Sequence, residues 1–86
     1  MKKYENKSNV VGNLIKSYRE KAKLSKSEVA KRLQFHAVYI DRTELKRIEA
    51  NEMIVKDFEL IAFSLVLDID LNELKLIYKD FIDNEK

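Results

Sequence analysis

The residues best suited to chemistry in this sequence lie close together in the segment Asp41–Arg47, which reads DRTELKR. Arg42 and Thr43 directly follow the aspartate, and Lys46 and Arg47 come one helical turn later. An arginine can pair with guanine through two parallel hydrogen bonds, and a threonine methyl can contact the methyl group of thymine. Each good pair discriminates between bases by about 1–3 kcal/mol. These residues are therefore suited to nucleic-acid contact if one helix presents them together.

The charge distribution favours an anionic partner for the first half of the chain. The formal net charge is only +2 at pH 7. Residues 1–47, however, carry 13 Lys or Arg against 5 Asp or Glu, whereas residues 48–86 carry 4 Lys against 10 Asp or Glu. A basic half beside an acidic half indicates a polyanion partner. The alternative is a solvated helical surface whose polarity has no function.

The composition argues against other kinds of chemistry. The 86 residues form one small domain, and the lack of cysteine excludes disulfide scaffolds, cysteine zinc sites and cysteine nucleophiles. The single glycine excludes glycine-rich phosphate loops. His36 is alone, Asp70 is explained as a helix cap, and the serines lack a base, so we expect no metal, no cofactor and no catalysis. The protein is predicted not to be an enzyme.

The overall class is predicted to be all-α. One glycine and no proline leave long uninterrupted stretches, and no turn pair separates alternating strands. No run of about 18 apolar residues is present, and the N-terminus has no apolar signal region. We therefore expect a cytoplasmic protein with no membrane partner.

Three capping boxes mark predicted helix starts. In a capping box, the side chain of the N-cap residue and that of a glutamate three residues later each accept a hydrogen bond from a free backbone N–H. Ser25 and Glu28 have this spacing, as do Asp41 and Glu44. Asp70 and Glu73 have the same spacing. Three caps support the helix count better than periodicity alone does.

Hydrophobic periodicity predicts five helices, at about residues 10–23, 26–34, 42–50, 55–67 and 71–83. The residues expected to face the core are Val11, Leu14, Ile15, Tyr18 and Ala22 in the first helix, Val29, Ala30 and Leu33 in the second, Leu45 and Ile48 in the third, Phe58, Ile61, Ala62 and Leu65 in the fourth, and Leu71 and Leu74 in the fifth. The segment Gln34–Ile40 is either a loop or a continuation of the second helix.

The second and third helices together are typical of a helix-turn-helix. Ala30 supplies the small residue that lets two short helices cross closely. In such a unit, the first turn of the later helix reaches base edges in the major groove. The N-terminal dipole of that helix also favours a nearby phosphate.

At this point the sequence resembles the Cro and lambda-repressor type of helix-turn-helix proteins, often called the XRE family. The resemblance covers about residues 11–74 and depends on three pieces in order, LSKSEVA, LKRIE and DIDLNEL. It implies an all-α, five-helix lambda-repressor-like domain, to which this sequence adds an extended C-terminal helix. It also implies a regulator that binds double-stranded DNA through its third helix.

The resemblance implies roles for single residues. Base-facing positions correspond to Arg42, Thr43 and Arg47, and phosphate-contacting positions to Ser25, Lys26 and Lys46. Arg19 and Glu49 correspond to a partly buried ion pair between the first and third helices. If this pair is truly buried, removal of one partner should cost about 3–5 kcal/mol.

The sequence departs from the family pattern in four places. Leu33 and Leu45 lie twelve residues apart, whereas the usual interval is several residues shorter, so we expect an extended turn. Glu44 is acidic on the third helix, and Glu52 stands where the family often has a residue that contacts phosphate. Lys56 occupies the expected cap of the fourth helix, where Asp57 is a possible substitute.

The fifth helix continues past the usual end of the family domain. Its apolar residues Ile77, Tyr78, Phe81 and Ile82 either fold back over the first helix, covering Val10 and Leu14, or form a dimer seam. We favour a homodimer, because an exposed apolar stripe of this length usually meets a partner. A two-fold axis would then place two recognition helices about 34 Å apart, which is one turn of DNA. The chain would then consist of a flexible basic tail (1–9), a DNA-binding domain (10–75) and a possible dimerisation segment (76–86).

The sequence thus predicts a sequence-specific, DNA-binding transcriptional regulator. The alternative is a protein-interaction module, antitoxin-like or adaptor, on a helix-turn-helix scaffold with weak or no specific DNA binding. Glu44, Glu52 and the acidic second half of the chain motivate that alternative. A continuous positive surface around the third helix would favour DNA, and a mixed surface would favour a protein partner.

Overall fold

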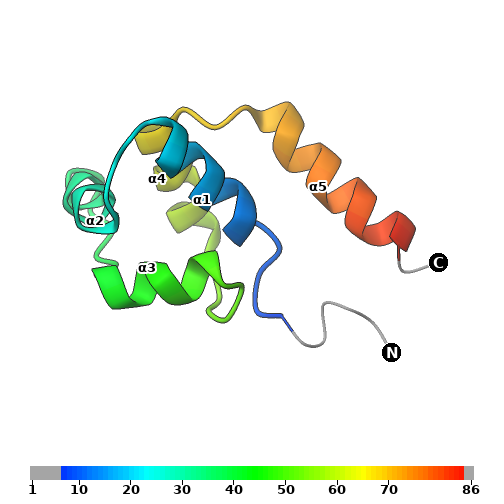
Figure 1. The fold of residues 1–86 in the computed structure, drawn as a ribbon, viewed down its shortest axis with the longest axis horizontal. Helices are drawn as coiled ribbons and strands as arrows, with labels where there is room; N and C mark the ends of the chain where they lie inside the picture. The colour runs from blue at the N-terminus through cyan, green and yellow to red at the C-terminus, as the bar shows by residue number, and fades with distance from the viewer. Residues whose placement is uncertain (1–6, 85–86) are drawn as a thin grey trace.

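The computed structural model describes residues 7–84, and the side chains of residues 7–79. Within that range the chain forms five α-helices and no β-strand, which confirms the all-α class. The helices are α1 (Gly12–Lys21), α2 (Lys26–Gln34), α3 (Arg42–Glu49), α4 (Asp57–Leu67) and α5 (Leu71–Asn84). Figure 1 shows α1 lying in front of α4, with α2 and α3 beside them, while α5 points away from this group. In the part of the chain that the structure describes, no helix has the length and apolarity to cross a membrane.

The core lies between the first four helices. Its completely buried side chains come from all four of them: Ile15, Val29, Leu33, Leu45, Ile48 and Phe63. Burial of each such side chain contributes about 1.5–3 kcal/mol, so these residues fix how α1 to α4 pack. The inward residues predicted for α2 and α3 are confirmed, because Val29, Ala30, Leu33, Leu45 and Ile48 are all buried.

The prediction for α4 was wrong in which face it buries. Of the four residues expected to face the core, only Ala62 is buried, at 3% exposure. Phe58, Ile61 and Leu65 are 54%, 62% and 64% exposed. Phe63 and Leu67 face the core beside Ala62 instead. Because α4 carries apolar residues on all sides, periodicity could not identify the side that packs inward.

The first two capping boxes are confirmed. At α2, the N–H of Glu28 donates to Ser25 Oγ at 3.0 Å, and the N–H of Ser25 donates to Glu28 Oε1 at 2.8 Å. At α3, the N–H of Glu44 donates to Asp41 Oδ1 at 2.7 Å, and the N–H of Asp41 donates to Glu44 Oε1 at 3.0 Å. At α4, Glu59 Oε1 accepts from the N–H of Lys56 at 2.9 Å, while Asp57 Oδ1 accepts from the N–H of Phe58.

The third predicted box is replaced by a bridge from α1. Asp70 Oδ1 accepts a hydrogen bond from the N–H of Asn72, so it caps α5 as expected. The N–H of Asp70, however, donates to the hydroxyl of Tyr18 at 3.2 Å, and this hydroxyl donates to Glu73 Oε1 at 2.7 Å. The hydrogen bond to Glu73 raises the pKa of Tyr18 above its ordinary value. The start of α5 is therefore anchored to α1.

The segment between α2 and α3 is a turn rather than more helix. After α2, the N–H groups of His36 and Val38 both donate to the carbonyl of Leu33, and Ala37 adopts the left-handed conformation with φ 59°. Val38 and Ile40 are buried, while Phe35 and Tyr39 are 82% and 76% exposed. The long connection thus adds two apolar residues to the core and leaves two aromatic rings in solvent.

The only glycine of the chain serves close packing rather than a turn. Gly12 begins α1 against the end of α3, and an added Cβ would overlap the carbonyl oxygen of Ile48. Its N–H donates to Oδ1 of Asn9 at 2.9 Å and to Oδ1 of Asn51 at 3.1 Å. Nδ2 of Asn9 donates to the carbonyls of Ile48 and Met53. Asn9, which we placed in the N-terminal tail, therefore joins the start of α1 to the last turn of α3 and to Met53, which follows it.

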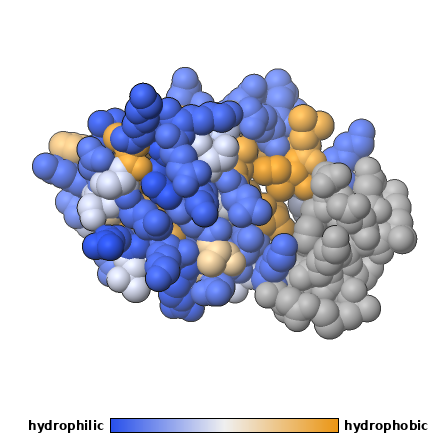
Figure 2. Space-filling model, viewed as in Figure 1, coloured by the Kyte–Doolittle hydropathy of each residue, from blue (hydrophilic) through white to orange (hydrophobic). Residues whose placement is uncertain are grey.

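The fifth helix is only partly packed. Leu74 and Ile77 pack against the core, but Leu71, predicted to be buried, is 66% exposed. Tyr78 is 60% exposed, and the side chains of Phe81 and Ile82 lie outside the described residues. In Figure 2, apolar surface is visible between α1 and the first turns of α5, whereas the surface over α3 is largely hydrophilic.

Candidate nucleic-acid interface

The outward face of α3 carries the side chains selected from the sequence. Arg42, Thr43, Lys46 and Arg47 are all exposed, whereas Leu45 and Ile48 anchor the other face in the core. The helix is only eight residues long, so its geometry depends on this anchoring and on the Asp41 cap. The structure thus presents the four polar side chains on one rigid support.

Two helix starts share a hollow beside α3. This hollow of about 390 Å³ is lined by Ser25, Lys26 and Ser27 at the start of α2, by Arg42 at the start of α3, and by Arg19. Backbone N–H groups and the positive dipole end of a helix favour an anion. Three of the five lining residues add cationic or hydroxyl groups from α2. The hollow therefore offers conditions that suit a phosphate group.

A second hollow, of about 240 Å³, brings together lysines from three helices. Lys16 of α1, Lys26 of α2 and Lys46 of α3 line it, together with Glu49 and Ala50. Lys26 lines both hollows, so the cationic surface is continuous across α1, α2 and α3. We refer to Lys16, Lys26, Arg42 and Lys46 as the basic surface.

Lys16 was not among the residues predicted from the sequence to contact DNA. It lies outside the apolar stripe predicted for the first helix, where a lysine usually needs no explanation. One signal was nevertheless present: Lys16 lies three residues before Arg19, on the same side of α1, and Arg19 was expected to pair with Glu49 of α3. A residue on that side had to lie near α3 as well.

The acid of the second hollow is neutralised by an ion pair. Glu49 Oε2 accepts from Nε of Arg19 at 2.7 Å, and Oε1 accepts from Nη2 at 3.0 Å. Nη1 donates to the carbonyl of Leu24 at 3.0 Å. Arg19 and Glu49 are 8% and 6% exposed, and the hydrogen bonds with Glu49 raise the pKa of Arg19. The pair holds α1 against α3 without leaving a free carboxylate in the hollow.

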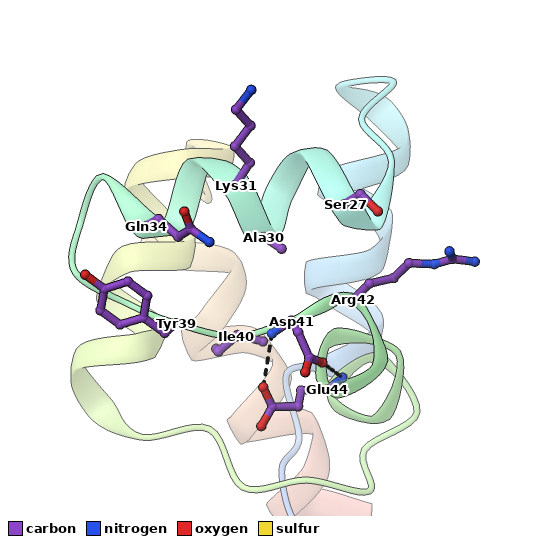
Figure 3. A pocket seen from close by; sticks show the side chains of 9 residues that line it. All are labelled: Ser27, Ala30, Lys31, Gln34, Tyr39, Ile40, Asp41, Arg42 and Glu44. Atoms are coloured by element: carbon purple, nitrogen blue, oxygen red, sulfur yellow. Dashed lines mark hydrogen bonds between the residues drawn. The ribbon is translucent and has the colours of Figure 1, made fainter.

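Two other acids near the basic surface are engaged as helix caps. Glu28 accepts the N–H of Ser25, and this hydrogen bond lowers the pKa of its carboxyl. Glu44, the acidic residue of α3, accepts the N–H of Asp41 and lines a different groove between α2 and α3. Figure 3 shows the carboxylate of Glu44 below Asp41, while the guanidinium of Arg42 points away from it.

The groove between α2 and α3 has about 450 Å³ of volume and a mixed lining. Ala30 lies at its centre, where the two helices approach each other, and Tyr39 closes one end (Figure 3). Lys31 and Gln34 extend from α2 above it (Figure 3). The small Ala30 side chain keeps the helices close, which fixes the position of the α3 start relative to α2.

Two of the base-facing candidates lie away from the hollows. Thr43 and Arg47 are exposed on α3 but line neither of them. Nη2 of Arg47 lies 3.4 Å from the carbonyl oxygen of Glu52, in the connection that follows α3. The structure therefore brings together Arg42, Lys26 and Ser25, and places Arg47 farther along the helix.

Comparison with known proteins gives one result for this arrangement. A protein-family model described as helix-turn-helix matches residues 15–74, which is more than half of the chain. The match begins within α1 and ends within α5, so it includes both hollows. Searches of curated proteins and of solved structures gave no significant match.

Proposed function

Because the chain belongs to the helix-turn-helix family of the Cro and lambda-repressor type, we propose that it binds double-stranded DNA and regulates transcription. The basic surface is the observation that carries this proposal. Its four cations come from three helices and line two adjoining hollows, and Glu49, which lines one of them, is paired with Arg19. Such a surface suits a phosphodiester backbone that crosses the start of α2.

We propose that Lys16, Lys26, Lys46 and Ser25 contact phosphates, and that Arg42, Thr43 and Arg47 read bases. Arg42 is the strongest candidate for base reading, because it is exposed in the first turn of α3, where recognition helices approach base edges. Arg47 can offer its Nη2 group to DNA only by giving up the hydrogen bond to the carbonyl oxygen of Glu52. Sequence specificity is the part of the proposal that depends on these contacts.

Selection from a pool of random duplex DNA at about 150 mM salt tests specificity. We expect one enriched motif for the wild-type chain, and a palindrome if the bound species is a dimer. Arg42→Ala should relax the preference at one position by about 1–3 kcal/mol. Undiminished preference in Arg42→Ala would contradict its role as a base-reading residue.

Salt dependence tests the phosphate contacts separately. Lys26→Ala and Lys16→Ala should each weaken binding to all sequences alike, and each should reduce the slope of log K against log salt concentration by about 0.9. Lys21→Ala is the matched control on α1, because Lys21 lines neither hollow and its ammonium lies 5.4 Å from the centre of the Tyr18 ring. Equal slopes for the Lys16 and Lys21 variants would remove Lys16 from the interface.

A second candidate function is a protein-interaction module with weak or no specific DNA binding. The exposed apolar side chains of α4 favour it, because a DNA contact does not need them. The same selection separates the two functions. No enrichment, with weak binding that Arg42→Ala leaves unchanged, would support the interaction module.

We also propose that the protein is a homodimer. A dimer doubles the DNA contacts and fixes the spacing of two half-sites at about 34 Å or a multiple of it. Exposed apolar side chains on α4 and α5 support self-association, so each of these helices is a candidate for the dimer interface.

A further inference from the structure

One side of α4 is both apolar and open to solvent. Phe58, Ile61 and Leu65 are 54–64% exposed, and Ile54, which precedes the helix, is 66% exposed. Phe58, Ile61 and Leu65 are separated by three and four residues, which places them in a single stripe along the helix. We call Phe58, Ile61 and Leu65 the α4 stripe.

Few polar or charged side chains surround the stripe along most of its length. The segment Leu60–Leu67 has no charged residue, and its one polar side chain, Ser64, donates its hydroxyl to the carbonyl of Leu60 at 3.0 Å. A helix that is apolar on all sides is normally covered on all sides. Among the residues that the structure describes, α1 and α2 pack against the side of α4 that carries Ala62, Phe63 and Leu67.

We propose that the α4 stripe is covered by the α4 stripe of a second copy, with the two helices antiparallel about a two-fold axis. Antiparallel pairing centred near Ile61 puts Phe58 of each copy opposite Leu65 of the other, and it leaves the two Ile61 side chains adjacent. Such isologous contact needs a surface that complements itself. An uncharged centre meets this condition, because it brings no like charges together.

The charged groups at the ends of the stripe favour a second copy as the occupant. The ammonium of Lys56 lies 5.9 Å from the centre of the Phe58 ring, at one end of the stripe. Asp57 is exposed at the same end, where its carboxylate accepts the N–H of Phe58 as part of the helix start. Asp68 is exposed at the other end, just beyond Leu67. Antiparallel pairing brings Lys56 of one copy towards Asp68 of the other, twice, whereas parallel pairing would bring like charges together.

The alternative seam on α5 fits less well. Ile77 already packs against the core of its own chain, and the exposed Tyr78 lies between lysines at positions 75 and 79. The inference deepens the proposed homodimer and depends on self-association, but it does not depend on DNA binding.

Sedimentation equilibrium of the full chain without DNA tests the interface. We expect a wild-type dimer and at least roughly a hundredfold weaker association for Ile61→Glu, because this change would bury two like charges at the two-fold axis. Leu76→Glu, at a position of nearly equal exposure on α5, is the matched control and should still dimerise. Circular dichroism checks that both variants keep their helices, since both positions are solvent-exposed in the single chain.

A charge exchange tests the register. Lys56→Glu should weaken association by roughly fivefold, as expected for the loss of two exposed ion pairs, and a second change, Asp68→Lys, should restore it. Two results would overturn the proposal. One is a wild-type chain that stays monomeric at about 100 µM, a concentration that would populate any dimer of Kd below that value. The other is a dimer that Leu76→Glu dissociates and Ile61→Glu does not. Because DNA is absent, either failure leaves the DNA-binding proposal standing.

Discussion

Helices α3 and α4 differ in which kind of side chain they expose to solvent: α3 exposes polar residues, and α4 exposes mostly apolar ones. In α3, Glu49 is a carboxylate that is 6% exposed, and every exposed residue of the helix is polar. In α4, Phe58 is a phenyl ring that is 54% exposed, and most exposed residues are apolar. The usual rule that charges lie outside and rings inside is thus reversed at one residue in each helix.

Each reversal has a different physical cause. Glu49 can be buried because Arg19 offers two N–H donors in the geometry of a carboxylate, so the charge is paired and hydrogen-bonded. Within residues 7–79, whose side chains the structure describes, Phe58 stays 54% exposed, and the ammonium of Lys56 lies 5.9 Å from the centre of its ring. In α3, the buried Glu49 is paired within the chain, and the exposed basic side chains suit an anion. In α4, the exposed apolar side chains suit an apolar partner.

Single alanine variants of Glu49 and Phe58 should differ in how their stability depends on protein concentration, and Glu49→Ala should give the largest loss of stability. Glu49→Ala leaves the Arg19 guanidinium buried without its partner and should lower the free energy of unfolding by about 3–5 kcal/mol. This loss should not depend on protein concentration. Thermal unfolding followed by circular dichroism measures it.

Phe58→Ala should behave differently in the same measurement. At low protein concentration, where a dimer dissociates, the change should stay within about 0.5 kcal/mol, as is usual for an exposed site. At high concentration it should lower the Tm, because stability linked to association is lost. A large loss at every concentration would mean that Phe58 supports the fold of the single chain, and the contrast with α3 would fail.

The sequence predicted α3 well because the relevant signals are local. The Asp41 cap, Glu44 and the inward pair Leu45 and Ile48 lie within eight residues of one another. The α4 prediction failed for the converse reason: apolar residues on all sides leave no amphipathic pattern to read. The Glu73 prediction failed because the hydroxyl of Tyr18, from α1, takes the place that a glutamate normally has in a capping box.

The role of Gly12 could not be predicted from the sequence, because glycine is required there by contact with Ile48, almost forty residues later in the chain. Gly12→Ala should destabilise the protein, although alanine has the better helix propensity by about 1 kcal/mol. The added Cβ would overlap the carbonyl oxygen of Ile48, which belongs to the α3 backbone and cannot rotate away. Overpacking of this kind costs about 1–3 kcal/mol. Chemical denaturation measures the change, and Asn13→Ala, an exposed neighbour in α1, is the control that should show no loss.

The smallest expected change in stability concerns the hydrogen bonds by which the hydroxyl of Tyr18, in α1, holds the start of α5. The hydrogen bond to Glu73 raises the folded-state pKa of Tyr18 above its unfolded value of about 10. The neutral phenol therefore contributes stability that is complete below pH 10 and is lost as the pH rises through the folded-state pKa.

Tyr18→Phe removes this titration together with the bridge to Asp70 and Glu73. We expect the Tm of the wild-type chain to fall more steeply above pH 10 than that of the variant, so that the difference in Tm between them narrows. Tyr78→Phe, at an exposed position on α5, should keep the wild-type dependence. If Tyr18→Phe instead gave parallel curves from pH 7 to pH 11, the phenol would not hold α5, and the link between the two halves would have to come from the packing of Leu74 and Ile77 alone.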